Sequence, residues 1–118
     1  MFSYENLEVY KKAFVANQEV FRFLKGNRVI PLYAKSQLGR ASVSIMLNIA
    51  EGSAKLSKKD RRNFYTTARG STFESACLVT FLTAEEAMPA ELNKKLCSLY
   101  EEISKMLFVM IRNLDREQ

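Results

Sequence analysis

The sequence predicts an all-α protein, an antiparallel up-down-up-down four-helix bundle that assembles as a homo-oligomer. Glycine and proline are scarce, at 4 and 2 of 118 residues, which disfavours a turn-rich β fold. Apolar residues recur at three- and four-residue spacings, as they do on the buried face of a helix. Start and stop signals divide the chain into four such segments with short connections, which favour antiparallel neighbours. The length is that of one domain, residues 1–118.

The first two helices are expected over residues 6–25 and 32–52. Asn6 is a suitable N-cap because its side chain can accept a hydrogen bond from the first turn. Gly26 supplies a stop signal for the first helix, since glycine is favoured just beyond a helix C-terminus. Gly52 is expected to end the second helix in the same way.

The last two helices are expected over residues 57–87 and 89–116. Ser57 with Asp60 three residues later has the pattern of a capping box, in which each side chain bonds the other's backbone N–H. Pro89 suits the first turn of the fourth helix, where its missing N–H costs nothing.

The first helix carries more apolar surface than one position in a bundle requires. Its apolar residues cover two adjoining sectors, which together exceed the usual buried stripe. Such a surplus is typical of a protein–protein contact, although loose packing within one chain would also account for it. The candidate residues for self-association are Val9, Ala16 and Phe23, with Phe108 and Val109 of the fourth helix.

A polar stripe lies between apolar residues on the second helix and faces similar residues of the third. We expect a buried hydrogen-bonded network formed by Arg40, Ser44, Asn48, Glu51 and Glu74. Buried charges must be paired, so such a network would specify helix registry more than stability. The alternative interpretation is that Glu51 and Glu74 form a carboxylate pair for metal or acid–base chemistry. The Glu-x-x-His pattern of di-metal bundles is missing because the chain has no histidine.

The residue inventory favours a protein without catalytic activity, cofactor or small-molecule substrate. Histidine, the commonest general base and metal ligand, is absent. Cys77 and Cys97 have no CxxC spacing, so they are expected to be reduced, buried residues rather than zinc ligands. The chain contains neither an apolar run long enough to span a bilayer nor the pattern of a signal peptide, so the cytoplasm is expected.

Positive charge is concentrated in the middle of the chain. Residues 55–84 carry six basic and two acidic side chains, whereas residues 85–118 carry five and seven. A patch of this kind can attract a polyanion, and no RRM, KH or zinc-finger pattern is present, so phosphates would be the main contacts. The candidate residues for binding RNA or DNA are Lys55, Lys58, Lys59, Arg61, Arg62 and Arg69.

The run RASVSIMLNIAEG, Arg40 to Gly52, carries a resemblance to a known family. Together with Asn6 to Tyr10 and the segment from Phe64 to Glu74, it resembles the proteins encoded in intervening sequences of bacterial 23S ribosomal RNA genes, historically labelled ribosomal proteins. Arg69, just before Gly70, departs from the family motif, which maps here onto Arg40, Ser44, Asn48, Glu51, Gly52, Phe64, Gly70, Ser71 and Glu74.

The resemblance implies a small cytoplasmic bacterial protein with an antiparallel four-helix bundle and a homopentameric assembly. The family is also similar in architecture to accessory bundle proteins of diversity-generating retroelements, which form basic barrels and bind nucleic acid. Two functions follow as expectations. One is a non-enzymatic oligomer that binds RNA or DNA through its basic patch. The other is a structural or protein–protein interaction module, in which the patch is a solvated helix start.

Overall fold

The chain folds into four α-helices and a short 3-10 helix, and forms no strand within the part that the structure describes. The structure is a computed structural model, and it describes residues 1–116. The elements are η1 (Ser3–Asn6), α1 (Glu8–Leu24), α2 (Leu32–Ala54), α3 (Lys58–Ala84) and α4 (Ala90–Arg116). They form a compact, elongated body of 50 × 25 × 22 Å.

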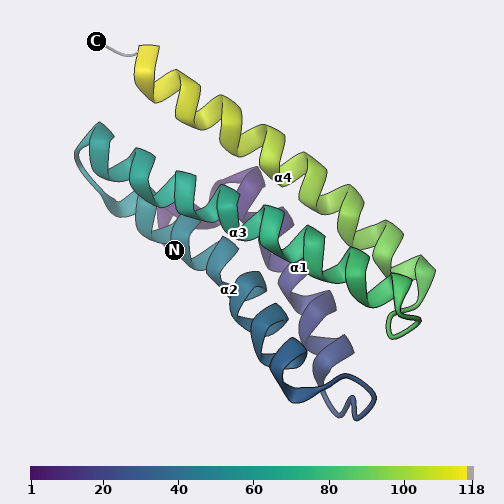
Figure 1. The fold of residues 1–118 in the computed structure, drawn as a ribbon. Helices are drawn as coiled ribbons and strands as arrows, with labels where there is room; N and C mark the ends of the chain where they lie inside the picture. The colour runs from purple at the N-terminus through teal and green to yellow at the C-terminus, as the bar shows by residue number, and fades with distance from the viewer. Residues whose placement is uncertain (117–118) are drawn as a thin grey trace.

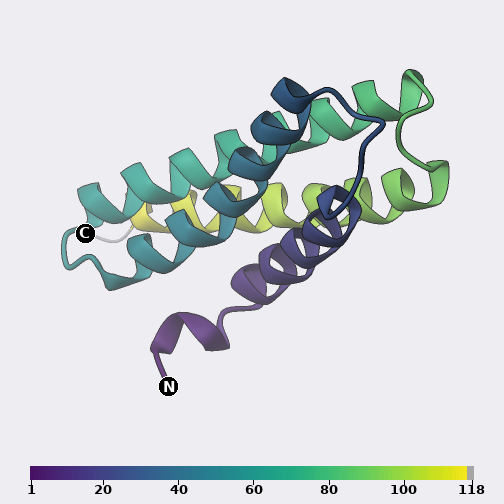
Figure 2. The same cartoon turned by 90° about the horizontal axis from the view of Figure 1, so that it is seen from below.

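The four helices pack in a ring, in which α1 contacts α2 and α4, and α3 contacts α2 and α4. Figures 1 and 2 show α3 and α4 side by side, with α1 and α2 running obliquely to them. Ser44 of α2 bonds Ser71 of α3, and Gln37 bonds Glu74, so residue numbers fall along α2 as they rise along α3. The α2–α3 turn lies at the same end of the molecule as the C-terminal turns of α4 (Figure 1), where Arg62 pairs with Asp115.

Two helix starts test the predicted caps. The serine half of the predicted capping box is confirmed, because the Ser57 hydroxyl accepts a 3.1 Å hydrogen bond from the backbone N–H of Asp60. The prediction for Asn6 is wrong, since this residue ends η1 and Leu7 precedes α1 without a side-chain cap. The aromatic residues of this segment stack on one another, which places η1 against the start of α1.

The helix ends depend on residues with positive φ. Gly26 follows α1 at a φ of 72°, as a glycine stop signal predicts. Helix α3 ends at Ala84 rather than at residue 87, because Glu86 adopts a φ of 60°. The N–H groups of Ala87 and Met88 then turn back to the carbonyl of Leu82, which closes the helix without a glycine. Sequence patterns offered no signal for this stop.

The core is mainly aliphatic and contains a tight contact between α2 and α3. Gly52 lies against Tyr65, where a Cβ atom would come within 2.6 Å of the ring and 3.1 Å of the Phe64 Cβ. Glycine at this position lets the two helices approach closely beside their turn. The largest fully buried aliphatic side chains come from α2 and α4 and are Leu38, Ile45, Ile49, Leu96, Ile103 and Leu107.

A group of buried hydroxyls, here called the hydroxyl layer, joins α2, α3 and α4. It consists of Ser42, Ser71, Thr72, Ser75 and Tyr100, all buried. The Ser71 hydroxyl lies 2.8 Å from that of Ser44, and Thr72 donates to the carbonyl of Ala68. The other three hydroxyls lie near one another but make no hydrogen bond of standard geometry within residues 1–116. Burial strongly raises the pKa of the Tyr100 phenol above its ordinary value.

Candidate nucleic-acid interface

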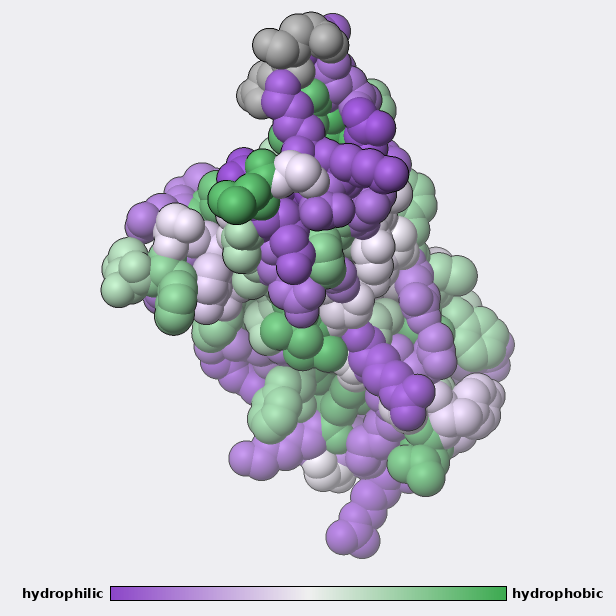
Figure 3. Space-filling model, turned by 90° about the vertical axis from the view of Figure 1, so that its left-hand side faces the viewer, coloured by the Kyte–Doolittle hydropathy of each residue, from purple (hydrophilic) through white to green (hydrophobic). Residues whose placement is uncertain are grey.

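One end of the molecule carries the excess positive charge. We define the basic end as residues 55–62, at the α2–α3 turn, and residues 112–116, at the end of α4. These segments carry seven basic and two acidic side chains, whereas the rest of the chain carries eleven of each. Arg62 of α3 forms an ion pair with Asp115 of α4, which joins the two segments. Figure 3 faces this end, where hydrophilic residues cover much of the surface.

Lys55, Arg61 and Arg62 contact neighbouring groups at the basic end. The Nε of Arg61 donates a 2.7 Å hydrogen bond to the carbonyl of Lys55, which stabilises the turn before α3. The Lys55 ammonium lies 5.0 Å from the centre of the Phe64 ring, a cation–π distance. Arg62 shares its charge with Asp115. These side chains therefore have structural contacts as well as charge.

Lys58 and Lys59 are exposed at the first turn of α3. The N-terminus of a helix carries partial positive charge, so two lysines there are unfavourable for the helix itself. They increase the positive potential of the basic end in a direction that faces solvent. These two lysines are the predicted residues best placed to contact phosphates.

Arg69 lies apart from the other predicted cations. It is on the face that α3 shares with α4, where its Nε donates a 3.1 Å hydrogen bond to the carbonyl of Ser104. Its guanidinium carbon lies 4.9 Å from the ring centre of Phe73 and 5.5 Å from that of Phe108. Arg69 therefore lies two helical turns along α3 from Arg62, rather than at the α2–α3 turn with the other predicted cations.

Arg112 and Arg116 belong to the basic end, and the sequence pattern did not indicate them. They lie in the last turns of α4, which pack beside the start of α3. In the sequence, these two arginines are notable only for their position near a helix C-terminus. Basic residues are common there because they interact favourably with the helix dipole. Tertiary packing alone brings them to the α2–α3 turn.

The predicted buried network is smaller than expected and contains no charge. Ser44 and Asn48 are half-buried, and the Asn48 amide donates to the Ser44 hydroxyl at 2.9 Å and to its carbonyl at 2.8 Å. Arg40, Glu51 and Glu74 are exposed instead. Their charges remain in water, which avoids the desolvation cost of burial. Glu74 accepts a hydrogen bond from Gln37 rather than pairing with Arg40.

Glu51 and Glu74 do not form a carboxylate pair. Glu74 lies beside Gln37, and Gln37 is fourteen residues before Glu51 on α2, which is about 21 Å along a helix. No group of three or more acidic or cysteine side chains within residues 1–116 could hold a metal ion.

The candidate contacts for self-association divide into buried and exposed residues. Val9 and Ala16 are in the core, at 2% and 0% exposure, so they are unavailable to another chain. Phe23 is half-buried against the core, whereas Phe108 and Val109 are exposed. The face of α1 that carries small side chains is buried. The phenylalanines Phe14 and Phe21 of the same helix are exposed.

Two further sequence expectations have structural outcomes. The two cysteines are free thiols, but Cys77 is exposed and Cys97 is half-buried, so the prediction that both are buried is wrong. Among the described residues, no helix is long and apolar enough to cross a membrane.

The fold and the basic end define a small all-α protein of four packed helices with a positively charged end. Sequence comparison then identifies its family: residues 5–109 match the family described as 23S rRNA-intervening sequence protein. The chain therefore belongs to this family. No curated protein matches the sequence.

Proposed function

We propose that this protein is a non-enzymatic homo-oligomer that binds a structured nucleic acid, RNA or DNA, through its basic end. The observation that carries this proposal is the charge distribution, because all of the net charge of +5 belongs to the basic end. A polyanion meeting the molecule is therefore attracted to one place rather than to the whole surface.

The contacts would be mainly to phosphates. Lys58 and Lys59 present point charges at the exposed surface, and lysines of this kind neutralise phosphates without reading a base. Binding would then weaken steeply with salt, with a slope of about 0.9 for each neutralised phosphate on duplex DNA. Affinity should accordingly depend little on sequence.

Assembly would multiply these contacts. In this proposal each chain is an antiparallel up-down-up-down bundle, which the opposite residue order along α2 and α3 supports. A hollow of about 350 Å³ on the α1–α2 face is lined by Phe21, Leu24 and Val43, and Phe14 lies in the neighbouring hollow. These apolar side chains support self-association, and a pentamer would present five basic ends together.

The experiment is a gel-shift series with structured ribosomal RNA at several salt concentrations. The double variant Lys58→Gln with Lys59→Gln should bind more weakly and show a shallower salt dependence. Lys94→Gln with Lys95→Gln is the matched control, since it removes the same charge from adjacent exposed lysines in the N-terminal part of α4. Equal binding by both double variants, or no binding by the unmodified protein at low salt, would refute the proposal.

The exposed phenylalanines favour a second candidate, an interaction module whose partner is protein. Light scattering separates the oligomer from this alternative. If the chain remains monomeric at micromolar concentration, self-association does not explain why Phe14 and Phe21 are exposed. An oligomer with no affinity for nucleic acid would favour a purely structural role.

A further inference from the structure

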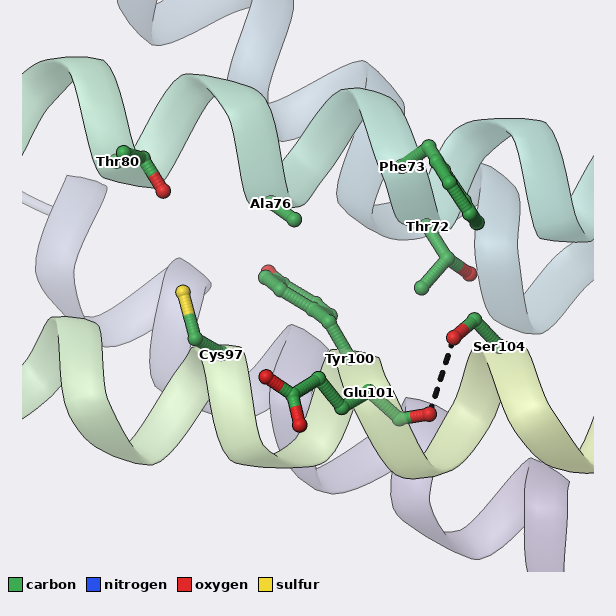
Figure 4. Close-up of a pocket in the computed structure, with 8 residues that line it drawn as sticks. All are labelled: Thr72, Phe73, Ala76, Thr80, Cys97, Tyr100, Glu101 and Ser104. Carbon is green, nitrogen blue, oxygen red and sulfur yellow. Dashed lines mark hydrogen bonds between the residues drawn. The ribbon is translucent and has the colours of Figure 1, made fainter.

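A pocket of about 310 Å³ lies between α3 and α4, outside the basic end. Figure 4 shows the Phe73 ring edge-on, extending from α3 toward α4, and the Tyr100 ring extending from α4 toward α3. Ala76, Thr80 and Cys97 line the pocket on one side of Phe73. The volume is at the lower end of the range for small-molecule pockets, so it suits a ligand of the size of one nucleobase.

Arg69 also contacts the Phe73 ring. Its guanidinium lies between Phe73 and Phe108, and its Nε is hydrogen-bonded to the Ser104 carbonyl. The two terminal nitrogens make no hydrogen bond or ion pair within residues 1–116. Since a guanidinium matches phosphate with its paired N–H donors, a stacked and oriented arginine is ready to bind one.

The order of residues along α3 places Phe73 between Arg69 and the part of the pocket that Ala76 and Thr80 line. Arg69 precedes Phe73 by about one turn, whereas Ala76 and Thr80 follow it by about one and two turns. Phe73 is exposed over more than half of its surface, at 57%. An exposed aromatic ring of this kind is a platform on which a base can stack.

We propose that this pocket binds an unpaired nucleotide of a single-stranded segment, with the base stacked on Phe73 and its phosphate on Arg69. The proposal rests on the proposed function and extends it from duplex phosphates to single strands. Charge decides which part of the nucleotide enters the pocket. The Glu101 carboxylate at its rim repels phosphate but can accept hydrogen bonds from base amino groups.

The same strand could continue to the basic end. Arg62 lies seven residues before Arg69 on α3, which is two helical turns on the same face and about 10 Å away. Arg112 lies one turn beyond Phe108 on α4. The aromatic platform and a cluster of cations thus lie along the same side of α3 and α4, which is the usual composition of a single-strand site.

The experiment measures fluorescence anisotropy of labelled oligoadenylate, both single-stranded and in duplex with oligouridylate, on the full chain. Phe73→Leu keeps an apolar side chain but removes the π face, and should weaken single-strand binding by about fivefold or more. Phe73→Tyr retains a ring and should bind as the unmodified protein does. Duplex affinity should change little in either variant.

Phe81→Leu is the matched control, since Phe81 is on the same helix, is 52% exposed and does not line the pocket. Equal losses in Phe73→Leu and Phe81→Leu, or a loss in Phe73→Tyr as large as in Phe73→Leu, would overturn the inference. So would a smaller assembly in Phe73→Leu by light scattering, because the groove would then be a contact between subunits.

The outcomes separate this inference from the proposed function. If the unmodified protein binds the duplex and Phe73→Leu leaves single-strand binding unchanged, the basic end still binds phosphates and only the nucleotide pocket is refuted. If neither form of the oligonucleotide binds at low salt, both proposals fail.

Discussion

The hydroxyl layer and the basic end are polar regions of this protein that differ in charge and in packing. The hydroxyl layer is buried between α2, α3 and α4 and contains only neutral groups. The basic end is exposed and holds seven cations, several of them in contact with a carbonyl, a ring or a carboxylate. Desolvation explains the division, because burying a hydroxyl costs far less than burying a charge.

The difference implies two kinds of sensitivity. The buried region between α2, α3 and α4 should respond to changes in side-chain size and to ionisation of a buried group. The basic end should respond to salt and to changes in charge, with little effect on folding. Four predictions follow that comparison, from the largest effect on stability to the smallest.

Gly52→Ala should cause the largest loss of stability, about 1–3 kcal/mol, which is typical of overpacking. The added Cβ would meet the Tyr65 ring at 2.6 Å and the Phe64 Cβ at 3.1 Å. Gly70→Ala is the matched control, since no atom lies within 4 Å of the new methyl group. It should stabilise α3 by about 0.5–1 kcal/mol. Urea denaturation measures both, and similar changes in the two variants would contradict the close α2–α3 contact.

Alkaline pH should destabilise the protein through Tyr100. Burial raises the pKa of this phenol in the folded state, so above about pH 10 the unfolded chain releases a proton that the folded chain retains. Stability therefore falls as pH rises through this range, by at most about 1.4 kcal/mol per pH unit for one proton. Tyr100→Phe should show a shallower fall when urea denaturation is repeated across the range. Parallel curves for the two proteins would contradict this assignment.

Lys59→Gln should stabilise the protein slightly, by about 0.3–1 kcal/mol, because it removes a positive charge from the first turn of α3. The gain should shrink as salt screens the helix dipole. Thermal unfolding at low and high salt measures this effect, with Lys94→Gln as a control one turn further into a helix. A loss of stability in Lys59→Gln would show that the basic end contributes to folding.

Lys12→Gln should have the smallest effect, with no measurable change in the thermal midpoint. Lys12 of α1 contacts Glu102 of α4 at 2.6 Å, and this hydrogen bond raises the lysine pKa. Exposed ion pairs nevertheless contribute little, since solvent competes for both charges. A clear fall in the midpoint at low salt would mean that charges outside the core do help to hold α1 against α4.

The positions of the helices could be predicted from local signals to within a few residues. Ser57 and Gly26 act on the backbone beside them, so their effect is visible in the sequence. The end of α3 was misplaced because Glu86 adopts a positive φ that a glycine would ordinarily supply. Asn6 was misassigned because the chain before α1 forms a 3-10 turn with its own packing.

The candidate site was only partly predictable. Lys58 and Lys59 were identified because they are adjacent in sequence to the other cations of the α2–α3 turn. Arg112 and Arg116 were missed, since they join the basic end only through packing of α4 beside α3. Arg69 is also near these cations in sequence, but it lies two helical turns along α3 from Arg62 and contacts Ser104 of α4 rather than the α2–α3 turn.

The sequence by itself determined the helices, the family and the excess of positive charge, because these depend on composition, spacing and local capping. The tertiary structure decided which side of each helix is buried. On α1 two apolar sectors were available, and the sector with Val9 and Ala16 packs inside because small side chains allow close helix approach. That choice leaves Phe14 and Phe21 outside, and packing of α4 on α3 likewise creates the groove beside Phe73. Such choices depend on the shapes of several helices at once.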